Sequence, residues 1–380
     1  MSIYLDYNAS TPVDERIIKH MIDVYQNYYG NADSRTHKYG TNSKELIEKS
    51  RGRIASLLNV EKNEIIFTSG ATESDNLAIL GISKYGQEKN RKHIITTAIE
   101  HKAVLEPVKY LAGCGFEIDF IKPDESGRID ANELLSLIRP DTLLVSVMHA
   151  NNETGIVQPV VEIGEALSGT ETFFHIDAAQ SCGKLVDELR QIKYDMLSIT
   201  AHKMYGPQGV GALVLKRKNY KRPPVKPVMF GGSHEGGLRP GTLPVALISG
   251  FGFAAEIAEQ EHKNNNTKYS LVKREIINQL DVSRVNYEIN GCQDYCIPNT
   301  INISFIGVDS EALMLSVKDS YSISNGSACT SHDYAPSHVL VSMGLEDTRI
   351  ESAVRLSWGY SLSEINIKPI IDSVLALNQH

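Results

Sequence analysis

Ser198-Ile-Thr-Ala-His-Lys-Met-Tyr-Gly-Pro-Gln-Gly-Val-Gly211 is the stretch that decides the fold of this chain. The apolar run Asp195-Met-Leu-Ser-Ile-Thr200 predicts a strand, and Lys203 follows it just before a Gly/Pro turn. A lysine amine at such a place becomes a nucleophile when burial or nearby cations lower its pKa. Thr200 and His202 add a hydroxyl and an imidazole, both of which suit a phosphate group.

A second predicted strand end lies upstream in His175-Ile-Asp-Ala-Ala-Gln180. An acid (Asp177) at one strand end and a lysine at the next are what a pyridinium cofactor needs: a partner for the ring nitrogen and an amine for the aldehyde. The two segments together therefore indicate pyridoxal phosphate (PLP). A dinucleotide site is excluded, because Gly206-Pro-Gln-Gly-Val-Gly211 lacks the required glycine spacing and runs into an apolar strand.

Composition sets the broad class. The chain has 380 residues, of which 42% are hydrophobic and 22% charged, enough for a large domain and a smaller one. Its net charge of -8 argues against a dedicated nucleic-acid surface. No apolar run approaches the ~18 residues of a membrane span, and the N-terminus lacks signal-peptide features, so a cytoplasmic protein is expected. Five cysteines form no disulfide framework, and Cys114 and Cys182 are expected to be packing residues.

From about residue 42 to 260, predicted helices alternate with apolar strands, which indicates a mainly parallel sheet covered on both faces. Asn42-Ser-Lys-Glu45 resembles a capping box and is predicted to open a helix. Lys263-Asn-Asn-Asn-Thr267 is predicted to break the chain between helices at 245–261 and 269–280. We therefore expect an α/β fold with a large domain over residues 15–262 and a smaller α+β domain formed by 1–14 with 263–380.

Other polar segments also follow predicted strands. Thr68-Ser-Gly-Ala-Thr-Glu-Ser-Asp-Asn76 is a strand-to-helix turn whose helix amides attract an anion. His101 and Asn152 each follow a strand, at the sheet edge where ligands bind in open α/β folds. Near the C-terminus Arg355 offers a bidentate partner for a substrate carboxylate.

Cys329 lies in the small polar run Ser324-Asn-Gly-Ser-Ala-Cys-Thr-Ser331. Its small neighbours would allow the thiol to be exposed and mobile, as nucleophilic attack by a thiolate requires. The alternative is a buried loop cysteine.

The chain resembles the PLP-dependent cysteine desulfurases, enzymes of the PLP-dependent transferase fold type I. The resemblance covers nearly the whole chain and rests on these segments in this order: 4–12, 30–31, 67–74, 100–101, 151–153, 175–180, 198–211, 239–242, 327–331 and 354–357. One departure is His332-Asp-Tyr-Ala-Pro-Ser337, which stands where the family usually has Ala-Ser-Leu-Glu-Pro-Ser and so leaves the sulfur acceptor open.

The resemblance implies a role for each matched residue. Lys203 would bond to the cofactor, Asp177 would pair with its ring nitrogen, Gln180 would bind its ring hydroxyl and His101 would stack on the ring. The remaining expected contacts are Ala71, Thr72, Thr200 and His202 on the phosphate, Thr242 from a second subunit of a homodimer, and Asn152 and Arg355 on the substrate.

The implied reaction converts L-cysteine to L-alanine, with Lys203 moving the α-proton and Cys329 taking the sulfur as a persulfide. The sulfur then passes to an acceptor protein for iron–sulfur cluster assembly, tRNA thiolation or DNA phosphorothioation. The alternatives are a selenocysteine lyase, an aminotransferase-like relative, or a non-catalytic scaffold in a sulfur-transfer complex.

Overall fold

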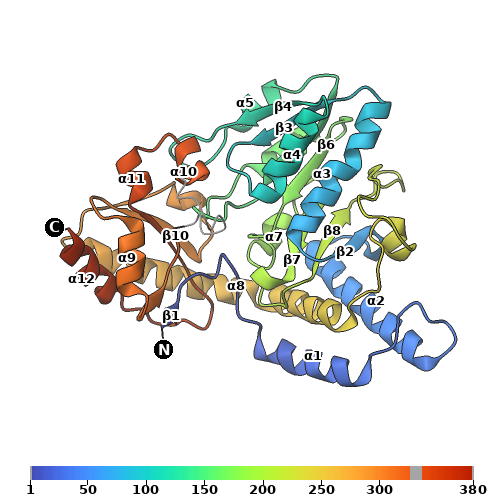
Figure 1. The fold of residues 1–380 in the computed structure, drawn as a ribbon, viewed down its shortest axis with the longest axis horizontal. Helices are drawn as coiled ribbons and strands as arrows, with labels where there is room; N and C mark the ends of the chain where they lie inside the picture. Colours follow the sequence, from blue (N-terminus) through green and yellow to red (C-terminus); the bar gives the residue numbers. More distant parts are fainter. Residues whose placement is uncertain (1, 326–335, 379–380) are drawn as a thin grey trace.

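Two lobes make up the molecule in the computed structural model, which describes residues 2–325 and 336–378. The larger lobe is built around a sheet of seven strands, and the smaller lobe contains the C-terminal part of the chain (Figure 1). The long helix α8 (Val245–Asp281) runs beneath both lobes and connects them.

The large sheet has the strand order β2-β8-β7-β6-β5-β3-β4. The five consecutive strands β7, β6, β5, β3 and β4 pair in parallel, whereas β8 is antiparallel to both β7 and β2. The strands are β2 (Ile65–Thr68), β3 (His93–Thr97), β4 (Glu117–Ile121), β5 (Thr142–Met148), β6 (Phe173–Asp177), β7 (Met196–Thr200) and β8 (Gly211–Leu215). The expected mainly parallel sheet is confirmed.

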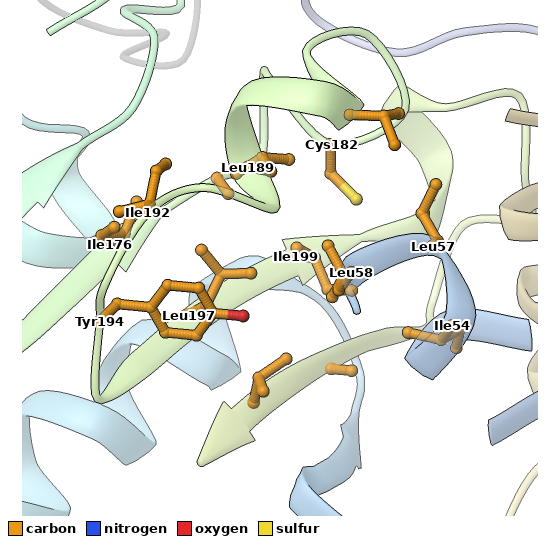
Figure 2. Packing of buried hydrophobic residues seen from close by; sticks show 14 of the residues in the cluster. Ile54, Leu57, Leu58, Ile176, Cys182, Leu189, Ile192, Tyr194, Leu197 and Ile199 are labelled. Atoms are coloured by element: carbon orange, nitrogen blue, oxygen red, sulfur yellow. The ribbon is translucent and has the colours of Figure 1, made fainter. Parts of the chain in front are cut away.

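Helices cover both faces of this sheet. Strands β5, β7 and β8 are therefore buried on both sides. One face packs against α3 (Ala71–Glu88) and α4 (Lys102–Gly113). The other packs against α2 (Lys38–Leu58), α5 (Ala131–Ser136), α6 (Val160–Leu167), α7 (Val186–Leu189) and the first half of α8, and α1 (Glu15–Asn27) packs on α8. Figure 2 shows part of the core on this second face, where Leu58 of α2 lies near Ile199 of β7.

The smaller lobe has its own core and an antiparallel sheet of order β12-β10-β9. Its strands are β9 (Tyr287–Ile289), β10 (Thr300–Phe305) and β12 (Ala353–Ser357), and β1 (Ile3–Tyr4) pairs in parallel with β11 (Tyr321–Ser322). Its helices are α9 (Ser310–Val317), α10 (His338–Ser342), α11 (Asp347–Glu351) and α12 (Lys368–Leu377). Short 3-10 helices span Lys62–Glu64 (η1), Ala201–Lys203 (η2), His234–Gly237 (η3) and Gln293–Tyr295 (η4).

The predicted break at Lys263-Asn-Asn-Asn-Thr267 is wrong, because α8 continues through it. Asparagine costs a helix less than about 1 kcal/mol per residue, which tertiary contacts outweigh. Asn265 is buried, and the Asn266 side chain donates a hydrogen bond to the backbone oxygen of Lys184 at 2.8 Å. Within α8 the packing changes from the large core at Ala258 to the small core at Tyr269. A domain limit near residue 263 stays a prediction.

Two local predictions also need correction. Helix α2 begins at Lys38, earlier than the predicted capping box, because the His37 side chain accepts a hydrogen bond from the amide of Gly40. Cys182 is buried as expected, whereas Cys114, at the end of α4, is exposed. In the described part of the chain, no helix is long and apolar enough to cross a membrane.

Candidate active site

A cavity of about 500 Å³ lies at the carboxyl ends of the parallel strands. Parallel strands bring the residues that follow them to one sheet edge, where open α/β folds bind ligands. Ten of the twelve residues predicted for the site line this cavity: Ala71, Thr72, His101, Asn152, Asp177, Gln180, Thr200, His202, Lys203 and Arg355. Arg355 comes from β12 of the smaller lobe, so the cavity lies between the two lobes.

Asp177 is the last residue of β6, and its side chain is almost wholly buried. One carboxylate oxygen accepts a hydrogen bond from the amide of Ala179 at 2.9 Å. Burial, and next the nearby Asp75 carboxyl, raise the pKa of Asp177. A buried carboxylate in this setting is stabilised by a cationic group in the cavity, which a protonated pyridine nitrogen would supply.

His101 is the N-cap residue of α4, and its Nδ1 accepts a hydrogen bond from the amide of Ala103 at 3.1 Å. This bond assigns the ring proton to Nε2 in the neutral form. Burial lowers the pKa of His101, so the ring is neutral near pH 7. A neutral, flat ring at the cavity wall suits stacking on an aromatic cofactor.

The start of α3 has the features of an anion site. Its N-cap residue, Gly70, has no side chain that could cap the helix, so the first amides of the helix remain available to a ligand. Strand β8 approaches this turn closely: a Cβ at Gly211 would lie 2.7 Å from the Cα of Gly70. Any larger residue at position 211 would therefore push into the turn.

Two further groups flank this turn. The Thr200 hydroxyl lies at the end of β7 and donates only a long hydrogen bond, 3.5 Å, to the oxygen of Val210. Burial lowers the pKa of His202 to about 4, and its Nδ1 lies 3.2 Å from the hydroxyl of Ser10. With the backbone amide of Ala71 and the hydroxyl of Thr72, these side chains form a set of neutral polar groups that fits a phosphate.

Gln180 and Arg355 line the cavity, and each has a buried side-chain atom without a hydrogen-bond partner among the described residues. Gln180 donates from Nε2 to the backbone oxygen of Asn8 at 2.9 Å, while its Oε1 has no hydrogen-bond partner among the described residues. Arg355 is 4% exposed and has an unpartnered Nε within the same set of residues. Buried polar atoms normally have partners, so these two atoms indicate a polar ligand.

Lys203 lies in η2, directly after β7, and its side chain is half-buried at the cavity wall. This places an amine at the strand end next to the one that carries Asp177, because β6 and β7 are paired neighbours. The residues present therefore fit PLP: an acid for the ring nitrogen, an amine for the aldehyde and neutral donors for the phosphate.

Two predicted residues do not join this cavity. Thr242 is exposed and does not line it, so its expected role depends on a second subunit. Cys329 lies outside the described residues.

Three residues of the site were not predicted from the sequence. Asp6 pairs with the Arg355 guanidinium, Asn8 accepts from Gln180, and Asp75 is fully buried in the cavity wall. Burial raises the pKa of Asp75 to about 7. Asp6 and Asn8 lie in segment 4–12, which carried only the family resemblance. Asp75 lies in the turn 68–76, which was predicted to bind an anion.

A metal centre has no support in the described ranges, 2–325 and 336–378, where no group of three or more His, Cys, Asp or Glu side chains could hold an ion. The sulfur of Cys296 lies 3.4 Å from the backbone oxygens of Thr154 and Thr300.

Comparison with known proteins agrees with this geometry. The class-V aminotransferase family matches residues 3–368. Cysteine desulfurase IscS of Vibrio cholerae serotype O1 (strain M66-2) is 42% identical over 377 residues, which cover 98% of this chain and 92% of that protein. A solved NifS-like protein has a TM-score of 0.88 at 34% identity, covering 100% and 99% of the two chains. The structure of DndA from Streptomyces lividans has a TM-score of 0.82 at 44% identity, covering 94% and 99%. The chain belongs to the class-V aminotransferase family and, within it, to the cysteine desulfurases.

Proposed function

We propose that this protein is a PLP-dependent cysteine desulfurase that converts L-cysteine to L-alanine and passes the sulfur to an acceptor protein. The observation that carries the proposal is the single cavity that unites His101, Asp177, Lys203 and Arg355. The relatives named cysteine desulfurase support cysteine as the substrate.

PLP, when bound, withdraws electrons from the substrate α-carbon through its protonated ring. The Asp177 carboxylate holds the proton on the ring nitrogen, because two opposite charges stabilise each other strongly at a buried site. The neutral donors around the start of α3 hold the phosphate, and Gln180 holds the ring hydroxyl.

Arg355 binds the substrate carboxylate, and Asn152, whose backbone oxygen accepts a hydrogen bond from Arg355, also lines the cavity. With the carboxylate fixed, the Lys203 amine removes the α-proton of cysteine and later returns a proton to the product. His101, neutral and held by α4, stacks on the ring and serves as a proton donor or acceptor through Nε2.

We assign sulfur removal to Cys329. Its thiolate attacks the sulfur of the substrate, the carbon–sulfur bond breaks, and the electron pair stays with the substrate carbon, which is then protonated to give alanine. The sulfur remains on Cys329 as a persulfide until the acceptor takes it.

Labelled L-cysteine tests this assignment. Mass spectrometry after one turnover should find the extra sulfur on Cys329 and on none of the other four cysteines. Cys329→Ser should bind cofactor normally and release no alanine, because a hydroxyl is a poor nucleophile toward sulfur. Label on another cysteine, with the serine variant still active, would overturn the mechanism. Selenocysteine assayed in parallel distinguishes a lyase, which would prefer it as substrate.

We also propose that the active protein is a homodimer in which Thr242 reaches the phosphate site of the second subunit. The exposed Thr242 and the strongly exposed Phe230, 86% accessible, lie in one segment of the surface before α8. Light scattering at assay concentration should give twice the monomer mass. A fully active monomer would contradict the proposal.

A further inference from the structure

Tyr205 stands two residues after Lys203 in a backbone conformation that aromatic residues rarely adopt. Its φ is 62°, in the left-handed region. Such strained conformations persist where the surrounding structure holds them in place, and they concentrate at functional sites. The contacts of Tyr205 show what holds it.

The backbone on both sides of Lys203 is fastened by Thr11. The Thr11 hydroxyl accepts a hydrogen bond from the amide of Tyr205 at 2.9 Å, and both the amide and the hydroxyl of Thr11 lie 2.9 Å from the backbone oxygen of His202. The amide of Asp14 donates to the oxygen of Tyr205 at 3.0 Å. The lysine turn is therefore attached to the N-terminal segment one residue before and two residues after Lys203.

The Tyr205 side chain reaches into the smaller lobe. Its hydroxyl lies 2.9 Å from the hydroxyl of Tyr269, a residue of the small core, and accepts a hydrogen bond from the amide of Tyr360 at 3.2 Å. Its ring centroid lies 4.5 Å from that of Tyr360. The Tyr360 hydroxyl in turn donates to Asp14 at 2.7 Å. Tyr360 follows β12, the strand that carries Arg355.

One side chain therefore connects the turn that carries Lys203 with the segment that follows Arg355. Proton transfer and carboxylate binding require these two groups to keep a constant separation, and a misplacement of about 1 Å costs large factors in rate. Neither residue can set that separation alone, because Lys203 follows a strand of the large sheet and Arg355 lies in the sheet of the smaller lobe.

We propose that Tyr205 is a positioning residue that holds the Lys203 amine in register with the Arg355 guanidinium. The inference rests on the roles proposed above for these two residues. Tyr205 itself is not proposed to contact substrate or cofactor.

The test is Tyr205→Phe in the cofactor-loaded protein. This variant keeps the ring and removes the hydroxyl with its contacts to Tyr269 and Tyr360. We expect kcat per loaded site to fall by about tenfold, while the dissociation constants of PLP and of L-alanine change by less than about twofold. Hydrogen–deuterium exchange at the Tyr360 amide should become about tenfold faster, because that amide loses its acceptor.

Tyr321→Phe is the matched control. It removes a buried tyrosine hydroxyl that bonds to the backbone oxygen of Asn366 in the smaller lobe, and Tyr321 does not line the cavity. It should lower thermal stability and leave kcat per loaded site unchanged. A wild-type kcat in Tyr205→Phe would overturn the inference, and so would an equal loss of kcat in Tyr321→Phe.

Two further variants make the result unambiguous. If Tyr205→Phe does not fold, Tyr269→Phe is tested in its place. We expect its kcat to fall by about threefold. A wild-type kcat in this variant would count against the inference. Arg355→Gln tests the underlying assignment separately. If it leaves the affinity for L-alanine unchanged, the proposed carboxylate site is wrong, whatever Tyr205→Phe shows.

Discussion

Arg355 donates a hydrogen bond from Nη1 to the backbone oxygen of Asn152 at 2.8 Å. The bond joins β12 of the smaller lobe to the loop that follows β5 of the larger lobe. On its other side the guanidinium pairs with the carboxylate of Asp6, from the N-terminal segment. Three parts of the chain therefore orient one cation at the cavity.

Arg355→Gln should lower kcat/KM for L-cysteine by about 100-fold or more, mainly through KM, because a charged hydrogen bond to the substrate carboxylate is lost. The measurement is steady-state alanine release. Arg139→Gln is the control: Arg139 pairs with Glu117 and Asp141 and does not line the cavity, so this substitution should leave kcat/KM unchanged. An unchanged KM in Arg355→Gln would contradict the assignment.

Asp177→Asn should retain cofactor and lose at least about 100-fold in kcat, because a neutral amide cannot keep the ring nitrogen protonated. Cofactor content by absorbance separates binding from rate. Asp130→Asn serves as a control, since Asp130 caps α5 and does not line the cavity. Near-normal turnover in Asp177→Asn would rule out the role.

Glu100→Gln should stabilise the protein more at pH 8.5 than at pH 5. Burial raises the pKa of Glu100 to about 8, well above its usual value. The folded state therefore holds a proton that the unfolded state releases, so this group's contribution to stability is present below about pH 4.5 and is lost as the pH rises toward 8.

Glutamine retains the acceptor that Thr97 and the amide of Met148 use, and it carries no charge. We expect the substitution to raise the free energy of unfolding by about 2–4 kcal/mol more at pH 8.5 than at pH 5. Urea denaturation at the two pH values measures this difference. An equal effect at both pH values would show that Glu100 is ionised in the folded protein.

Glu235→Ala should lower the free energy of unfolding by about 3–5 kcal/mol, because it removes the buried, bidentate partner of the Arg51 guanidinium and leaves the half-exposed Glu48 as its remaining carboxylate partner among the described residues. Glu235 binds Arg51 through both carboxylate oxygens, at 2.7 and 2.9 Å, and accepts a hydrogen bond from the amide of Phe67 at 2.8 Å. Glu117→Ala removes an exposed carboxylate that also pairs with an arginine and should cost less than about 1 kcal/mol. Chemical denaturation measures both, and similar losses would refute the distinction.

The local sequence pattern was sufficient to predict the strands of the large sheet and the polar residues at their ends. Strand β7 lies within the run predicted from residue 195 to 200, because a short apolar run flanked by polar residues leaves little choice of register. Asp177 and Lys203 were predicted to meet because residues that follow parallel strands share one edge of the sheet.

The sequence by itself determined the α/β class, the strand ends and the chemical types at the cavity, since each of these follows from side chains that are near one another in the chain. Only the tertiary structure decided that α8 is continuous, that Asp6 pairs with Arg355, and that Tyr205 joins the lysine turn to Tyr360. The physical reason is that these outcomes depend on partners far away in sequence: Asp6 and Arg355 are separated by 349 positions. Their interaction exists only after both lobes have packed, and no local preference of either segment encodes it.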